Sequence, residues 1–150
     1  MRGVGVGTVA RAADAAAALA AGAKFLVSPG TPARLATAFA QVPVPVIPGC
    51  ATVSEAMALA EHGFKVLKFF PAEAAGGVSW LKAVVAPLAE LKFCPTGGID
   101  LRNAGAYLAL PNVIAVGGSW PAPGEAMVAG DFSRIATLAG EAAQLPKRRR

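Results

Sequence analysis

Short runs rich in Val, Ile and Phe alternate along this chain with longer Ala-rich stretches. The apolar runs predict six β-strands, at Val4–Val9, Lys24–Val27, Pro45–Ile47, Lys65–Phe70, Lys92–Cys94 and Val113–Val116. Their first residues lie 20, 21, 20, 27 and 21 positions apart, which is the length of one strand, one helix and two short loops. The chain therefore reads as a series of repeated βα units.

The Ala-rich stretches predict a helix after each strand, at Ala10–Ala21, Pro32–Gln41, Ser54–His62, Gly77–Ala89, Asn103–Ala109 and Asp131–Ala143. Thr31 is expected to cap the second helix ahead of a first-turn proline, and Asp131 to cap the last. Gly22 and Gly63 are expected to end helices. Strict βα alternation predicts an α/β fold with a parallel sheet covered by helices, either an open doubly wound sheet or a (β/α)8 barrel with six of its eight units present.

Lys68 lies inside the fourth predicted strand, in the run Val66–Pro71. Its neighbours on both faces are apolar, so the strand is expected to be buried on both sides. An ammonium there is costly unless it is paired or becomes a neutral amine. A neutral amine in an apolar pocket can form a Schiff base with a carbonyl compound. The alternative is a strand-end lysine with its head in water.

Two consecutive strands end in a Gly-Gly pair beside a hydroxyl residue. Thr96 precedes Gly97 and Gly98, and Gly117 and Gly118 precede Ser119. Glycine allows close approach of the backbone to a ligand, and successive N–H groups can hold an anion. In a (β/α)8 barrel the loops after the last two strands are the usual phosphate site. We therefore favour a phosphate site over two simple tight turns.

Composition and charge exclude several other classes. The 150 residues suffice for one domain, and no apolar run reaches the ~18 residues of a membrane span. The net charge is +5, but four of the positive charges lie in a basic tail at 146–150, expected to be a solvated end. Without them, 10 basic residues face 9 acidic ones, and no aromatic-basic pattern indicates nucleic-acid binding. The glycines at 3, 5 and 7 lie within a strand, which argues against a dinucleotide-binding turn.

Cysteine and histidine are scarce. Cys50 and Cys94 form no disulfide framework or CxxC motif, and His62 is the single histidine of the sequence. A zinc site is therefore not expected, and a reduced, cytoplasmic setting is the default.

Several motifs together resemble the 2-keto-3-deoxy-6-phosphogluconate (KDPG) and 4-hydroxy-2-oxoglutarate aldolases. The resemblance is collinear, covers nearly the whole chain except the basic tail, and rests on Gly5–Val9, Val27–Gly30, Val46–Gly49, Lys68–Glu73, Phe93–Ile99 and Gly117–Trp120. It implies a (β/α)8 barrel, a homotrimer, no metal or organic cofactor, and cleavage of a keto-acid sugar phosphate to pyruvate and glyceraldehyde 3-phosphate.

The same resemblance implies roles for individual residues. Lys68 would be the Schiff-base lysine, and Phe70 would pack beside the iminium. Thr8 and Pro29 would line the pyruvate end of the site. The phosphate would be held by Thr96, Gly97, Gly98, Gly118 and Ser119. Neither nucleic acid nor membrane is an expected partner.

The family's chains begin about two strands earlier, and that segment supplies a proton-shuttling glutamate and an arginine. Residues 1–145 are thus expected to form one barrel domain without its first two strands, with open sheet edges. A start codon placed too late, a decayed gene or oligomerisation that covers the gap would each account for this; we favour the first. Glu73 is expected to lie near a following helix or to make loop hydrogen bonds rather than act as the base, and Asp100 is expected to cap a helix.

Three functional hypotheses remain open at this point. The first is a class I aldolase acting through Lys68, with the phosphogalactonate and 4-hydroxy-2-oxoglutarate compounds as alternative substrates. The second is a catalytically impaired remnant that still binds sugar phosphates. The third, a nucleotide-binding α/β module, lacks its motif.

Overall fold

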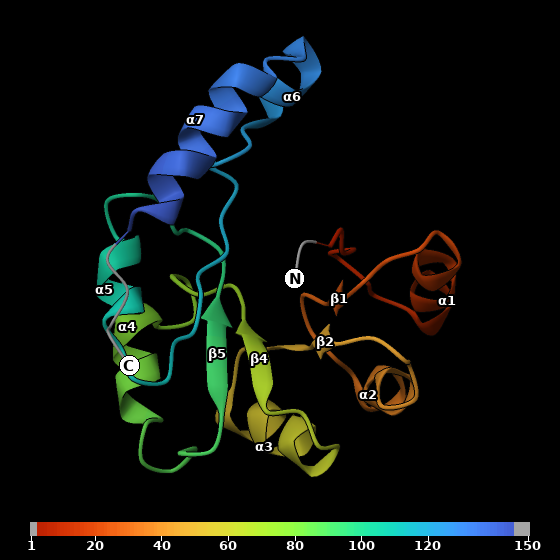
Figure 1. Ribbon diagram of the computed structural model, residues 1–150. Helices are drawn as coiled ribbons and strands as arrows, with labels where there is room; N and C mark the ends of the chain where they lie inside the picture. Colours follow the sequence, from red (N-terminus) through yellow and green to blue (C-terminus); the bar gives the residue numbers. More distant parts are fainter. Residues whose placement is uncertain (1–2, 146–150) are drawn as a thin grey trace.

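The computed structural model describes residues 3–145, so the basic tail predicted at 146–150 lies outside the described residues. The strands and helices form the alternating series that the hydrophobic pattern predicts (Figure 1). The strands are β1 (Leu26–Val27), β2 (Val46–Ile47), β3 (Gly49–Cys50), β4 (Val66–Phe69) and β5 (Lys92–Pro95).

Every strand pairing is parallel, and neighbours in the sheet are neighbours along the chain. β1 pairs with β2, and β3, β4 and β5 form a three-stranded sheet that continues it across Pro48. The predicted first and last strands are present only as short bridges. Val6 bridges to Leu26, and residues 113 and 117 bridge to β5 at Phe93 and to Thr96. Six parallel segments in sequential order confirm the predicted α/β class.

The helices follow the strands in order and lie at α1 (Ala12–Ala20), α2 (Ala33–Phe39), α3 (Val53–Glu61), α4 (Gly77–Ala83), α5 (Ala104–Leu108), α6 (Gly124–Ala129) and α7 (Phe132–Ala143). α4 ends six residues before the predicted Ala89. Pro87 explains this difference, since proline clashes with the carbonyl four residues before it. Figure 1 shows α6 and α7 together at one end of the molecule, and none of the α7 residues is buried.

The helix boundaries test the expected caps. Asp131 caps α7, and its side chain accepts a hydrogen bond from the Arg134 N–H at 3.0 Å. Gly22 and Gly63 follow α1 and α3 with φ of 89° each, which confirms them as helix ends. The prediction for Thr31 was wrong. Pro32 takes the N-cap position of α2 and offers no side-chain acceptor there, so the Thr31 hydroxyl is free to bond elsewhere.

The core forms on the helix-covered side of the sheet. Leu67 and Phe69 of β4 are fully buried, and the Phe69 ring stacks on Trp80 of α4 with 4.3 Å between ring centroids. Phe93 of β5 meets the same indole edge-on. A second cluster fills the space between β1, α1 and α2 around Leu26. Between residues 3 and 145 no helix is both long and apolar enough to cross a membrane.

Candidate active site

Lys68 lies on the face of β4 that the helices do not cover. Its neighbours Leu67 and Phe69 point into the core, whereas Val66 and Lys68 are half-buried. The expectation that β4 is buried on both sides was therefore wrong, because only one face carries helices. Burial still lowers the pKa of the Lys68 amine, and the neighbouring Cys94 opposes this shift. A lowered pKa increases the fraction of neutral, nucleophilic amine near neutral pH.

Lys68 is in register with one residue on each side, Gly49 on β3 and Cys94 on β5. Phe70, two residues further along the chain, places its ring centroid 4.6 Å from the Lys68 Nζ atom. On the other flank Gly49 has no side chain, and a Cβ there would lie 2.3 Å from the carbonyl oxygen of Pro29. The glycine thus lets the Pro29 backbone come close to the sheet beside Lys68. Of the predicted site residues, Phe70 thus contacts the amine, and Pro29 covers Gly49, the residue in register with Lys68.

A hydrogen-bond network that the sequence did not reveal holds the Pro29 loop. The Ser28 side chain is fully buried, and its Oγ accepts a bond from the Gly49 N–H at 3.0 Å. Thr31 Oγ1 lies 2.8 Å from the same Ser28 Oγ and donates to the Gly49 carbonyl at 3.0 Å. The loop after β1 is therefore fastened to the β3 backbone at the residue in register with Lys68. In the sequence, the one signal that could have indicated this network is the pair of hydroxyl residues, Ser28 and Thr31, on either side of Pro29.

We expect Ser28→Ala to destabilise the chain by about 1–3 kcal/mol, because a buried N–H of Gly49 loses its acceptor. Urea unfolding followed by circular dichroism measures this change. Ser79→Ala, at an exposed position of α4, is the matched control and should have little effect. Equal midpoints for the two variants would show that the network does not stabilise the loop.

Thr8 lies at the end of the first strand segment with φ of 61°, in the left-handed region that non-glycine residues seldom occupy. The next residue, Val9, donates its N–H to the Val27 carbonyl at 3.1 Å, so Thr8 is placed next to the strand end that leads to Ser28 and Pro29. The Thr8 side chain is exposed. Strained backbone of this kind is typical of functional positions.

The two Gly-Gly segments meet at the ends of β5 and the last strand segment. Thr96 bridges to Gly117, and a Cβ at Gly117 would lie 2.5 Å from Thr96 Oγ1. Gly97 has φ of 101°, and a Cβ on it would lie 3.2 Å from the Phe70 ring. The candidate phosphate loop therefore adjoins the residue that contacts Lys68. The structure brings both Gly-Gly segments to the same end of the sheet as the amine.

Gly98, Gly118 and Ser119 complete this edge of the sheet. Gly98 has φ of 75°, and Gly118 packs against the Trp120 indole so closely that a Cβ would lie 1.8 Å from a ring carbon. Ser119 is exposed, and its carbonyl accepts the Ala122 N–H at 3.1 Å. Glycine is thus required sterically at 118, and its backbone conformation favours glycine at 98.

Glu73 makes the loop contact expected of it. The buried Tyr107 of α5 donates its hydroxyl to Glu73 Oε1, and the Glu73 N–H donates to the Gly97 carbonyl at 3.2 Å. Burial, followed by the neighbouring Glu73 carboxylate, raises the pKa of the Tyr107 hydroxyl. Tyr107 therefore remains a neutral donor, and Glu73 spans from α5 to the Gly97–Gly98 loop.

Asp100 does not cap a helix in the predicted way. Its carboxylate accepts the Arg102 N–H at 2.8 Å and pairs with the Arg102 guanidinium, in the turn before α5. Asn103 is the N-cap residue of α5. The expected helix cap at Asp100 was therefore wrong, since the N-cap residue of α5 lies about one helical turn further along the chain.

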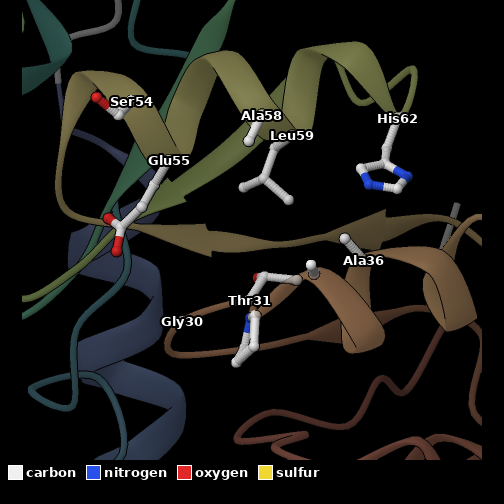
Figure 2. Close-up of a pocket in the computed structure, with 10 residues that line it drawn as sticks. Gly30, Thr31, Ala36, Ser54, Glu55, Ala58, Leu59 and His62 are labelled. Atoms are coloured by element: carbon white, nitrogen blue, oxygen red, sulfur yellow. The ribbon is translucent and has the colours of Figure 1, made fainter.

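A separate pocket of about 500 Å³ lies between α2 and α3, on the outer side of the sheet (Figure 2). Figure 2 shows Glu55 and His62 at opposite ends of the pocket, with Leu59 between them and Thr31 facing them from the start of α2. Glu55 already accepts the N–H groups of Ala51 and Thr52 at the start of α3. None of the predicted site residues lines this pocket.

These features define a class of protein: a parallel α/β fold that presents one half-buried lysine, flanked by a glycine, a thiol and an aromatic ring, beside two glycine-rich strand ends. The family model described as KDPG and KHG aldolase matches residues 3–138. The chain belongs to this family.

Individual relatives agree with this assignment. The 2-dehydro-3-deoxy-phosphogluconate aldolase of Dickeya dadantii is 49% identical over 139 residues, which span 93% of this chain and 65% of that protein. KDPG aldolase from Legionella pneumophila, crystallised with pyruvate captured as a covalent carbinolamine, superposes with a TM-score of 0.90 at 45% identity, over 92% of this chain and 67% of that one. The 2-keto-3-deoxy-6-phosphogluconate aldolase of Zymomonas mobilis, solved with 3-phosphoglycerate, superposes with a TM-score of 0.89 at 37% identity. The match covers 97% of this chain and 68% of that one.

Proposed function

We propose that this chain carries the Schiff-base site of a class I aldolase that cleaves 2-dehydro-3-deoxy-6-phosphogluconate to pyruvate and glyceraldehyde 3-phosphate. The observation that supports this most is the setting of Lys68. Its amine is half-buried, lies 4.6 Å from the Phe70 ring centroid, and has a pKa lowered by burial. The covalent pyruvate adduct of the Legionella pneumophila relative supports the same chemistry.

The setting of Lys68 suits the steps of such a reaction in which its amine forms and releases the covalent bond to the substrate. The neutral Lys68 amine attacks the keto carbon of the substrate, and the carbonyl oxygen leaves as water to give an iminium. The iminium accepts the electron pair of the breaking C–C bond, while the hydroxyl on the carbon that becomes the aldehyde passes its proton to a general base or to water. This releases the aldehyde and leaves an enamine. Protonation and hydrolysis of the enamine then release pyruvate and restore the amine. Pro29 and Thr8 would border the pyruvate carbons.

The phosphate is proposed to bind at the paired glycine loops. Gly97 and Gly98 have positive φ, a glycine backbone conformation that can turn successive N–H groups toward an anion, and Thr96 and Ser119 offer hydroxyls at the same edge. A relative that binds 3-phosphoglycerate supports a phosphate-bearing ligand. These loops favour a phosphorylated keto acid over 4-hydroxy-2-oxoglutarate, which has no phosphate to place there.

The proton-shuttling role is not assigned to Glu73, because that carboxylate is bonded to Tyr107 and lies against Gly98. The segments at 4–9 and 113–117 each pair with one neighbour among the described residues, and two more parallel strands between them would complete an eight-stranded barrel. We propose that residues 1–145 form six βα units of such a barrel. Assembly as a homotrimer in the cytoplasm remains part of this proposal.

The purified chain is expected to release pyruvate from 2-dehydro-3-deoxy-6-phosphogluconate. Coupling pyruvate release to lactate dehydrogenase and following NADH absorbance measures the rate. The 4-hydroxy-2-oxoglutarate compound, run in parallel, should react with a lower kcat/KM because it leaves the glycine loops empty. A rate no higher than that of a blank, with a folded protein, would refute turnover by this chain and favour the impaired-remnant hypothesis.

A further inference from the structure

Cys94 occupies the position beside the reactive amine. Residues in register on parallel strands project to the same side of a sheet, and Lys68 is in register with Cys94 on β5 and with Gly49 on β3. Of these two flanking residues only Cys94 has a side chain. The Lys68 side chain therefore extends between a thiol on one side and, on the other, a glycine covered by the Pro29 backbone.

The thiol at this position is small and uncharged. Cys94 is half-buried, and burial raises the pKa of its thiol, with Thr96 and Lys68 opposing the shift. At neutral pH the thiol is therefore protonated and provides no counter-charge for an ammonium. Cys50 is one residue further along β3, in register with Phe69, and faces the core instead.

The other charged group on the strands that flank Lys68 is Lys92 of β5, which is in register with Val66 and donates its ammonium to the Pro111 carbonyl at 3.2 Å. β3 presents Gly49, β2 presents Val46 and Ile47, and Phe70 presents an aromatic ring. Glu73, in the loop that follows, is engaged by Tyr107. Cys94 can oppose the lowered pKa of the Lys68 amine only as a thiolate, and burial raises the pKa of this thiol, so at neutral pH it leaves the amine without a counter-charge.

We propose that Cys94 is a positioning residue: a small, neutral wall that leaves the Lys68 amine in place beside the Phe70 ring and denies it a counter-charge. A carboxylate at 94 would pair with the ammonium and keep it protonated. A larger apolar side chain would occupy the space that the imine carbon needs. The use of the Lys68 amine in an aldolase reaction rests on the proposed function. The titration and the orientation of this amine do not.

The first test measures the titration of Lys68 without any substrate. The protein is labelled briefly with acetic anhydride over a series of pH values, and the extent of acetylation at Lys68 is read by peptide mass spectrometry. Cys94→Asp and Cys94→Asn have the same shape and differ in charge. The midpoint is expected to be higher in Cys94→Asp by roughly one pH unit or more, as for an opposite charge within a few ångströms. Ser79→Asp, which adds the same charge on exposed α4, should leave the midpoint unchanged.

The second test measures the effect of side-chain size at position 94. It does not use Cys94→Asp, so it remains informative if that variant fails to fold. Cys94→Val is neutral and apolar but larger, so the Lys68 midpoint should stay within a few tenths of a pH unit. Trapping of pyruvate on Lys68 by borohydride should slow by about tenfold or more. Equal midpoints for the Asp and Asn variants, or wild-type trapping by Cys94→Val, would each overturn the proposal. A protein that titrates as expected but traps no pyruvate in any form would refute the aldolase chemistry instead.

Discussion

Lys68→Met is expected to abolish cleavage of 2-dehydro-3-deoxy-6-phosphogluconate, with a fall in kcat of roughly a thousandfold or more, the scale of loss when a covalent nucleophile is removed. Methionine keeps an unbranched, apolar side chain in the space beside Phe70, so the fold should persist. The half-buried amine also costs desolvation, so its removal should leave stability unchanged or slightly raised. The coupled lactate dehydrogenase assay measures the rate, and urea unfolding measures stability.

Lys65→Met is the matched control for this variant. Lys65 lies on the same strand segment, three residues before Lys68, but its side chain is exposed and pairs with Glu90 at 2.8 Å. Exposed ion pairs contribute about 0–1 kcal/mol, so this variant should keep nearly full activity. If Lys68→Met retained activity similar to that of Lys65→Met, a Schiff base at Lys68 could not be the route of cleavage.

Gly98→Ala is expected to weaken phosphate binding by about tenfold or more while leaving imine formation intact. Gly98 has φ of 75°, and an added Cβ would lie 2.6 Å from Glu73 Cγ. Glu73 is held by Tyr107, so the loop rather than the carboxylate must move. Isothermal titration with 3-phosphoglycerate measures the affinity, and each tenfold loss corresponds to about 1.4 kcal/mol. Pyruvate trapping on Lys68 should change by less than about threefold, because pyruvate carries no phosphate.

Gly22→Ala is the control for Gly98→Ala, because it introduces similar backbone strain away from the candidate phosphate site. Gly22 has φ of 89° and no atom within 4 Å of an added Cβ, so the substitution imposes a left-handed alanine far from the strand ends. It should lower stability by about 1 kcal/mol without changing the affinity for 3-phosphoglycerate. Unaltered affinity in Gly98→Ala would place the phosphate away from this loop.

Much of the architecture could be predicted because each βα unit repeats the same local signals. Apolar strand runs, alanine-rich helices and the glycines after α1 and α3 all agreed with one another, and the structure follows them in order. Departures occur where proline changes the backbone. Pro48 separates β2 from β3, and Pro87 accompanies the early end of α4. α6 was missed because it begins directly after Pro123 and spans only six residues, too few for a helical period to show.

The candidate site was predicted in its chemistry but not in its surroundings. Lys68 and the two Gly-Gly pairs carry local sequence signals, a cation among apolar residues and glycines at strand ends. The roles of Ser28, Gly49 and Cys94 depend instead on register between strands that lie about 20 or more residues apart. A hydroxyl that bonds a backbone N–H across strands leaves no periodic trace in the sequence. The same holds for the half-exposed face of β4, which depends on where the helices pack.

The central claim is that Lys68 forms a Schiff base with a keto acid. Incubation of the purified wild-type chain with pyruvate, reduction with sodium borohydride and peptide mapping by mass spectrometry test it directly. We expect the mass of a reduced pyruvyl adduct on the peptide that contains Lys68, dependent on both pyruvate and borohydride and lost in Lys68→Met. No adduct in the folded wild-type chain, or an adduct carried by a different lysine, would contradict the account.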